Sequence, residues 1–271
     1  MAPLSELLPN SFLVVMAAMT ALWLLSLSLG NASIVDPFWG MGFILVTWLT
    51  VAKTPPERLV ARSWLLAALV TIWGLRLSLY LLWRNCGHGE DRRYRAMREQ
   101  HGSRFWWVSL LTVFWLQGVI LWIVSMPIQD AIWNGPTNRL LIQTFPLSVL
   151  DAVGISVWLV GFLFESIGDF QMSRFQAAPA NAGQVMDRGL WRYTRHPNYF
   201  GDFCVWWGLF LIAAGAGAGW AIFSPLLMSF LLLKVSGVTL LEQTITTRRP
   251  EYAEYQQRTN SFLPGLPRKR K

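Results

Sequence analysis

The apolar residues of this chain occur in long blocks that are separated by short polar segments. A helix of about 20 predominantly apolar residues spans a bilayer, and 54% hydrophobic residues are too many for a soluble domain of 271 residues. We therefore predict an all-α integral membrane protein, with one domain of seven transmembrane helices over residues 1–271. The expected helices cover about 11–29, 38–52, 64–83, 105–126, 147–168, 201–217 and 219–241.

Lys and Arg residues are distributed unevenly around these seven blocks. Basic residues near helix ends are retained on the cytoplasmic side of a membrane, and most of the 23 Lys and Arg residues follow odd-numbered blocks. This predicts an external N-terminus and a cytosolic C-terminus, with loops 84–104 and 169–200 and the tail 242–271 on the cytosolic side. The even-numbered blocks are followed only by Lys53, Arg58, Arg62 and Arg139.

The net charge of +8 is explained mainly by this topology. The basic run at 268–271 favours attraction to anionic lipid over nucleic-acid binding, because it belongs to a chain of apolar spans. Cys86 and Cys204 lie at different predicted depths, and the three histidines are scattered along the chain. We therefore expect no disulfide, no metal site and no nucleic-acid partner.

Polar residues within the apolar blocks are few, and they are spaced so that they share helix faces. Residues four apart lie on one side of a helix, and a charged group at membrane depth usually faces the bundle interior. The alternative for each group is a purely structural ion pair between helices. The groups are Arg76, Tyr80 and Arg84 in the third block, Glu165 and Asp169 in the fifth, and Asn198 and Asp202 in the sixth.

These faces point toward the predicted cytosolic side of the membrane. A cationic rim above carboxylates suits a large anionic cofactor, because Arg binds phosphate through paired hydrogen bonds, while Asn and Asp bind ribose hydroxyls or a carboxamide. The chain has no Gly-rich phosphate loop or dinucleotide fingerprint, so a nucleotide would have to bind in another way. The rim consists of Arg174, Arg195, Arg248 and Arg249.

The segment Asp-Pro-Phe-Trp-Gly at 36–40 begins the second block. Pro37 suits the first turn of a helix, and Trp39 is expected at the mouth of that helix. Asp36 has two interpretations: a simple helix N-cap, or an acid that faces a substrate inside the bundle.

The run Gly-Leu-Trp-Arg-Tyr-Thr-Arg-His-Pro-Asn-Tyr-Phe-Gly-Asp at 189–202 resembles the C-terminal signature of the steroid 5α-reductase family. Segments 36–40, 90–94 and 249–264 resemble that family as well, so the resemblance covers most of the chain. It implies a seven-helix reductase of the 3-oxo-5α-steroid 4-dehydrogenase type in a bacterial inner membrane, with an active site open to the cytosol.

The resemblance also implies a reaction. NADPH would supply a hydride to the β-carbon of a 3-oxo-4-ene steroid or a related enone lipid, while a hydrogen-bond donor stabilises the enolate oxygen. The steroid would enter from lipid into a pocket bounded by the first four helices, and the protein is expected to be a monomer. The implied cofactor-binding residues are Arg84, Asp169, Arg174, Arg195, His196, Asn198, Tyr199, Asp202, Arg249, Tyr252 and Tyr255.

A glutamate and a tyrosine in the N-terminal half of the family hold the 3-oxo group. Asp36 and Tyr80 are the best candidates for this pair, with Trp73 as an alternative to the tyrosine. Glu165 occupies a position that family members fill with asparagine, and it is the third catalytic candidate. The expected substrate-binding residues are Trp39, Trp73 and Arg76.

Other functions fit parts of the pattern. Membrane isoprenylcysteine carboxyl methyltransferases share an Arg-His-Pro-x-Tyr motif but bind S-adenosylmethionine, and they are the first alternative. Sterol reductases that act on another double bond are a second. A transporter or structural membrane protein would explain the helices and intramembrane charges, but not the polar cluster at 195–202.

Overall fold

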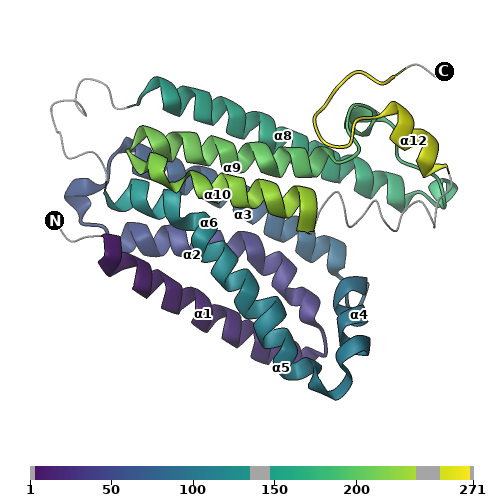
Figure 1. Cartoon of the computed structure of the whole chain (residues 1–271), viewed down its shortest axis with the longest axis horizontal. Helices are drawn as coiled ribbons and strands as arrows, with labels where there is room; N and C mark the ends of the chain where they lie inside the picture. Colours follow the sequence, from purple (N-terminus) through teal and green to yellow (C-terminus); the bar gives the residue numbers. More distant parts are fainter. Residues whose placement is uncertain (1–3, 135–146, 236–250, 269–271) are drawn as a thin grey trace. The chain divides into compact units, whose positions relative to one another are not determined.

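The computed structural model describes residues 4–134, 147–235 and 251–268, and within these ranges the regular structure is entirely helical. No strand occurs among the described residues, which confirms the predicted all-α class. The α-helices labelled in Figure 1 are α1 (Leu4–Leu29), α2 (Val35–Lys53), α3 (Ala61–Asn85), α4 (Arg92–His101), α5 (Phe105–Ser109), α6 (Leu116–Trp133), α8 (Val149–Ala177), α9 (Pro197–Gly215), α10 (Phe223–Phe230) and α12 (Tyr252–Arg258).

Six helical segments of the described chain are long and apolar enough to cross a membrane, which identifies an integral membrane protein. The predicted sixth span corresponds to α9, which is not among these six, since its first turns contain Asn198 and Asp202. The count of seven spans and the orientation of the termini therefore stay predictions. The six segments are Leu4–Leu29, Ala32–Lys53, Ala61–Asn85, Arg92–Trp133, Val149–Ala177 and Ala218–Val235.

The chain forms two compact units. Unit 1 comprises Met1–Ser148 and Ala213–Ala221, and unit 2 comprises Val149–Ile212 and Ile222–Lys271. Unit 1 contains α1 to α6, whereas unit 2 contains α8, most of α9, α10 and α12.

In unit 1, α2 and α3 pack closely because two glycines face each other. A Cβ atom at Gly40 would lie 2.4 Å from the Gly74 carbonyl oxygen, and one at Gly74 would lie 2.7 Å from the Gly40 oxygen. Small residues allow backbones to approach in this way in membrane helix pairs. The crossing holds the first turn of α2, which contains Asp36, beside the helix that carries Tyr80.

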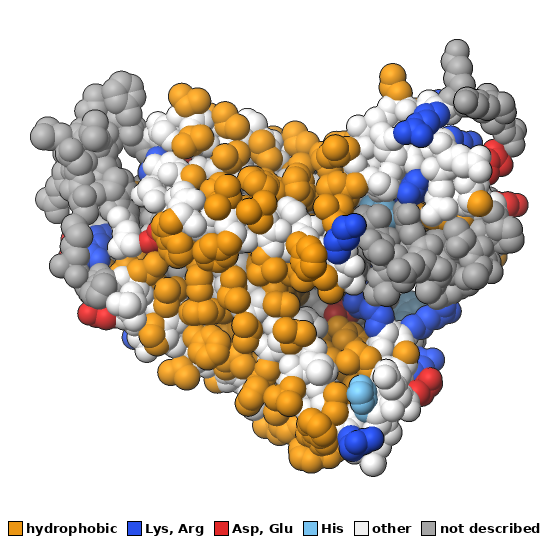
Figure 2. All heavy atoms as spheres, viewed as in Figure 1, with side chains coloured by type: hydrophobic (Ala, Val, Ile, Leu, Met, Phe, Trp, Pro, Cys, Tyr) orange, Lys and Arg blue, Asp and Glu red, His pale blue; other side chains and the backbone are white. Residues whose placement is uncertain are grey.

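Tryptophan side chains connect α1 to the long segment that contains α5 and α6. The indole N–H groups of Trp23, Trp115 and Trp122 donate to the Trp106 carbonyl, the Thr20 hydroxyl and the Leu8 carbonyl, at 2.8, 3.0 and 3.2 Å. Outside these contacts the surface is apolar, as Figure 2 shows over α1 and α6. This is the surface expected for contact with lipid.

A π-helical segment, Leu110–Trp115, joins α5 to α6. Such wider turns are uncommon and change the face that the following residues present. Gln117 follows this segment by two positions, and its side chain contacts Tyr94 of α4.

In unit 2, α8 and α9 run side by side and approach closely at glycines (Figure 1). A Cβ atom at Gly201 would lie 2.4 Å from the Glu165 nitrogen, and one at Gly161 would lie 2.5 Å from the Gly201 carbonyl oxygen. Gly154 and Gly208 form an equivalent contact one heptad away. This close approach brings the cytosolic end predicted for α8 against the first turn of α9.

Candidate functional site

A carboxylate–phenol pair is the centre of the polar cluster in unit 1. Asp36 lies in the first turn of α2, whose N-cap is Ile34, so the simple N-cap interpretation of Asp36 is wrong. Its carboxylate accepts the Tyr94 hydroxyl at 2.6 Å and the Arg93 guanidinium at 2.9 Å. Gln117 donates to the Tyr94 oxygen at 3.4 Å. Tyr94 is buried, so the pair is a fixed acid–phenol unit at the start of a transmembrane helix.

A second group of hydrogen bonds holds α4 against the start of α2. Glu90 accepts the Ala32 N–H at 2.8 Å and is bound by two nitrogens of Arg98, at 2.8 and 2.9 Å. The Asp91 N–H donates to the Ser33 hydroxyl at 2.7 Å. Because Arg93 and Tyr94 belong to α4, these bonds fix both partners of Asp36.

The predicted residues of α3 form a cation–π series. The guanidinium groups of Arg76 and Arg84 lie 5.4 and 5.8 Å from the centre of the Tyr80 ring. The predicted shared face of these three residues is therefore confirmed, since residues four apart meet on one side of a helix.

Aromatic rings connect the two tryptophans that were expected to contact a substrate. Trp39 packs edge-on against Phe43 with ring centres 5.3 Å apart, and Phe43 packs against Trp73 at 5.8 Å. Trp73 and Phe43 are fully buried, whereas Trp39 is half-buried. In the structure described here Trp73 is a core residue, and Trp39 is the more accessible member of the series.

In unit 2, the motif residues at the start of α9 contact the end of α8. The Asn198 amide donates to Asp169 at 3.2 Å, and the Trp191 indole donates to the Gly168 carbonyl at 3.0 Å. His196 and Tyr199 stack with ring centres 5.5 Å apart. Asp169 and His196 are buried. The polar residues at the end of α8 and at the start of α9 therefore meet.

Arg195 attaches the C-terminal segment to this motif. Its Nη1 donates to the backbone carbonyls of Gln256 and Thr259, at 2.9 and 2.7 Å, and its own N–H donates to the Asn260 carbonyl at 2.9 Å. The Tyr255 hydroxyl donates to the Trp191 carbonyl. Tyr252 packs edge-on against Tyr255 with ring centres 5.4 Å apart. Motif residues 191–195 and tail residues 255–260 are therefore joined in one hydrogen-bonded layer.

Residues 22–259, which include both polar clusters, match the model of a family described as "Protein of unknown function (DUF1295)". The chain belongs to this family. The chain is also similar to the uncharacterized protein C594.04c of Schizosaccharomyces pombe, with 24% identity in an alignment of 231 residues that covers 76% of this chain. The alignment spans 64% of the length of that relative. No solved structure matches the chain.

Three of the remaining predicted site residues, Glu165, Asp202 and Arg174, lie in unit 2. Glu165 is buried where α8 meets Gly201 of α9, and Asp202 lies in the second turn of α9. The Arg174 guanidinium lies 5.7 Å from the centre of the Phe170 ring. Arg249 lies outside the described residues.

Tyr94 was not chosen as a site residue from the sequence, although it ends the motif at 90–94. The signal that could have found it is the dense charge of that motif, since a tyrosine after two acids and two arginines has polar partners nearby. Gln117, in a long apolar segment, carried a weaker signal.

The Glu90 contacts predict a pH dependence of stability for the DUF1295 protein. Burial raises the pKa of the Glu90 carboxyl, but the hydrogen bonds from Arg98 and Ala32 and the Arg98 charge more than offset this, so the pKa lies below its usual value. A carboxyl with a lowered pKa contributes stability above its unfolded pKa and loses it as the pH falls. The thermal midpoint in detergent should therefore exceed that of Glu90→Gln at pH 7, with the difference shrinking below about pH 4.

A control for this measurement is Glu99→Gln, which removes an exposed carboxyl from α4, the helix that begins two residues after Glu90. Its midpoint should follow that of the native protein at every pH. A constant difference between native protein and Glu90→Gln from pH 7 to pH 3 would contradict the assigned role of Glu90.

Proposed function

We propose that this protein reduces the carbon–carbon double bond of an enone lipid, such as a 3-oxo-4-ene steroid, with NADPH as the reductant. The observation that supports this most is the 2.6 Å hydrogen bond between Tyr94 and Asp36 at the start of a transmembrane helix. The resemblance of segments 36–40, 90–94 and 189–202 to steroid 5α-reductases supports the same reaction.

The acid–phenol pair has the chemistry that enone reduction requires. As the β-carbon of an enone accepts a hydride, negative charge develops on the carbonyl oxygen, and a well-placed donor lowers the barrier by about 3 kcal/mol. We assign that donor role to the Tyr94 hydroxyl, which would turn from Asp36 to the carbonyl oxygen of a bound substrate. Arg93 and Gln117 hold the two partners in place. The tyrosine of the proposed pair is therefore Tyr94, in place of the Tyr80 expected from the sequence.

The donor set at the junction of α8 and α9 fits a nucleotide cofactor. Asp169 can accept hydrogen bonds from ribose hydroxyls, Asn198 can both donate and accept, and the two side chains are already within 3.2 Å. The stacked rings of His196 and Tyr199 offer flat surfaces beside them. When bound, NADPH would supply the hydride to the β-carbon, and a proton from solvent would then add at the α-carbon to complete the reduction. Arg195 would serve this site by holding the tail, because its guanidinium bonds to backbone carbonyls.

The direct test is NADPH consumption by the detergent-purified protein with progesterone or testosterone, with the product identified by mass spectrometry. A gain of two hydrogens at the 4,5 double bond would support the proposal. S-Adenosylmethionine is tested in parallel with an isoprenylated cysteine acceptor. Methyl transfer without any NADPH consumption would replace the reductase with the methyltransferase alternative.

Variants at the α8–α9 junction should affect cofactor affinity. Hydrogen bonds to charged groups contribute about 1.5–3 kcal/mol, so Asn198→Ala or Asp169→Asn should raise the NADPH dissociation constant about 10- to 100-fold. Isothermal titration calorimetry in detergent measures this directly. Ser156→Ala, which removes an exposed hydroxyl from α8, serves as the control. Unchanged affinity in both site variants would place the cofactor elsewhere.

A further inference from the structure

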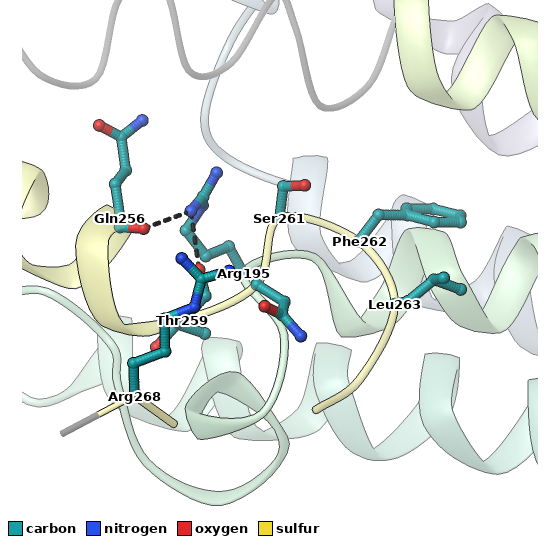
Figure 3. A pocket seen from close by; sticks show the side chains of 8 residues that line it. Arg195, Gln256, Thr259, Ser261, Phe262, Leu263 and Arg268 are labelled. Carbon is teal, nitrogen blue, oxygen red and sulfur yellow. Dashed lines mark hydrogen bonds between the residues drawn. The ribbon is translucent and has the colours of Figure 1, made fainter. Parts of the chain in front are cut away.

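An open pocket of about 600 Å³ lies in unit 2 between the motif loop (residues 189–196) and the C-terminal segment (residues 256–268). Figure 3 shows the guanidinium groups of Arg195 and Arg268 on one side of it, while Phe262 and Leu263 extend on the other. The wall is completed by the segment that follows α12. The lining residues are Arg195, Gln256, Thr259, Asn260, Ser261, Phe262, Leu263 and Arg268.

The charge of this lining favours an anion. Two of the eight lining residues are arginines and none of them is acidic, so an anion between the arginines would relieve the repulsion of like charges. Arg195 is held by the Gln256 and Thr259 carbonyls, and the Arg268 N–H donates to the Arg258 carbonyl at 2.9 Å. The Arg195 guanidinium is therefore held in place before a ligand arrives, whereas Arg268 is anchored beside it through its backbone. Ser261 and Asn260 add neutral donors of the kind that bind phosphate oxygens.

The apolar side of the pocket indicates that the anion carries a hydrocarbon part. Leu263 lines the pocket and is 63% exposed, and Leu266, which lies between the lining residues Leu263 and Arg268 in the chain, is 85% exposed. A free phosphate or a soluble nucleotide would leave these leucines in water. The sequence then continues from Arg268 as Lys-Arg-Lys. Exposed leucines beside a basic segment are typical of a surface that inserts shallowly into an anionic membrane.

We propose that this pocket binds the phosphate of an anionic phospholipid headgroup, with Arg195, Arg268 and Ser261 around the phosphate and Leu263 and Leu266 against the acyl chains. The bound lipid would join the tail, and through Arg195 the motif loop, to the membrane surface. This site is independent of the proposed reductase reaction, because lipid binding requires neither NADPH nor an enone.

The test is native mass spectrometry of the detergent-purified protein titrated with phosphatidylglycerol or phosphatidylcholine in the absence of NADPH. We expect at least tenfold tighter binding of phosphatidylglycerol. Arg268→Gln and Ser261→Ala should each reduce that preference several-fold, whereas Arg104→Gln, which removes an exposed arginine from unit 1, should leave it unchanged. Equal binding of the two lipids, or an Arg268→Gln variant with native lipid preference, would overturn the proposal.

A competition experiment distinguishes a lipid site from a site for soluble phosphate compounds. Inorganic phosphate and glycerol 3-phosphate carry the anion without acyl chains, and they should compete only weakly with phosphatidylglycerol. Leu263→Ser should weaken phosphatidylglycerol binding and leave glycerol 3-phosphate binding unchanged. If glycerol 3-phosphate bound as tightly as the lipid, the pocket would be a soluble phosphate site and the lipid proposal would be wrong. Unchanged thermal midpoints would show that each variant is folded.

Discussion

Tyr94→Phe is expected to lower the turnover number of enone reduction about 100-fold, with NADPH affinity close to native. The phenylalanine keeps the buried ring but removes the hydroxyl that bonds to Asp36 at 2.6 Å. If that hydroxyl stabilises the enolate oxygen, its loss removes about 3 kcal/mol from the transition state, which corresponds to about 100-fold in rate. Single-turnover kinetics with saturating NADPH and steroid measure the chemical step, and calorimetry measures cofactor affinity.

Tyr80→Phe is the matched comparison for this experiment. Both variants remove one phenolic oxygen, but Tyr80 lies between the guanidinium groups of Arg76 and Arg84. A ring keeps most of its cation–π attraction without the hydroxyl, so turnover in Tyr80→Phe should stay within a few-fold of native. Native turnover in Tyr94→Phe together with a large loss in Tyr80→Phe would return the catalytic role to Tyr80.

Gly201→Ala is expected to destabilise the protein by about 2 kcal/mol or more. The added methyl group would lie 2.4 Å from the Glu165 nitrogen and 2.6 Å from the Gly161 carbonyl oxygen, both of which are backbone atoms. Helices α8 and α9 would have to separate, which would also lengthen the Asp169–Asn198 contact. The measurements are the thermal midpoint in detergent, which should fall, and the NADPH dissociation constant, which should rise.

Gly219→Ala provides the control, because no atom within 4 Å would meet the added methyl group. It should leave the thermal midpoint and NADPH affinity unchanged. If Gly201→Ala behaved like this control, the close approach of α8 and α9 would not be required for stability or for cofactor binding.

The helical part of the fold could be predicted well because the apolar blocks have the length that a bilayer requires. Helix α9, which the sequence predicts as the sixth span, is not among the six candidate spans for a physical reason. Its first turns carry Asn198 and Asp202, which lower its mean hydropathy. The contact between Asp169 and Asn198 could have been predicted, since Asp169 ends one apolar block and Asn198 lies just before the next. The glycines at 154, 161 and 168, spaced by seven, are a sequence signal for the close packing of α8 that was overlooked.

The partners of Asp36 and Arg195 were harder to predict. Asp36 and Tyr94 are 58 residues apart, and their meeting depends on the bonds from Glu90 and Asp91 that place α4. Residue spacing within one helix carries no information about such a contact. The acceptors of Arg195 are backbone carbonyls, which every residue possesses, so no side-chain pattern could identify them.

The contacts of Arg195 also bear on the order in which the protein matures during synthesis. Its guanidinium bonds to the carbonyls of residues 256 and 259, some 60 residues further along the chain. The helices of unit 1 can leave the ribosome and pack before that segment exists. The motif loop can take its final form only after the segment at 256–260 has emerged, so assembly of this layer is a late event in the biogenesis of the protein.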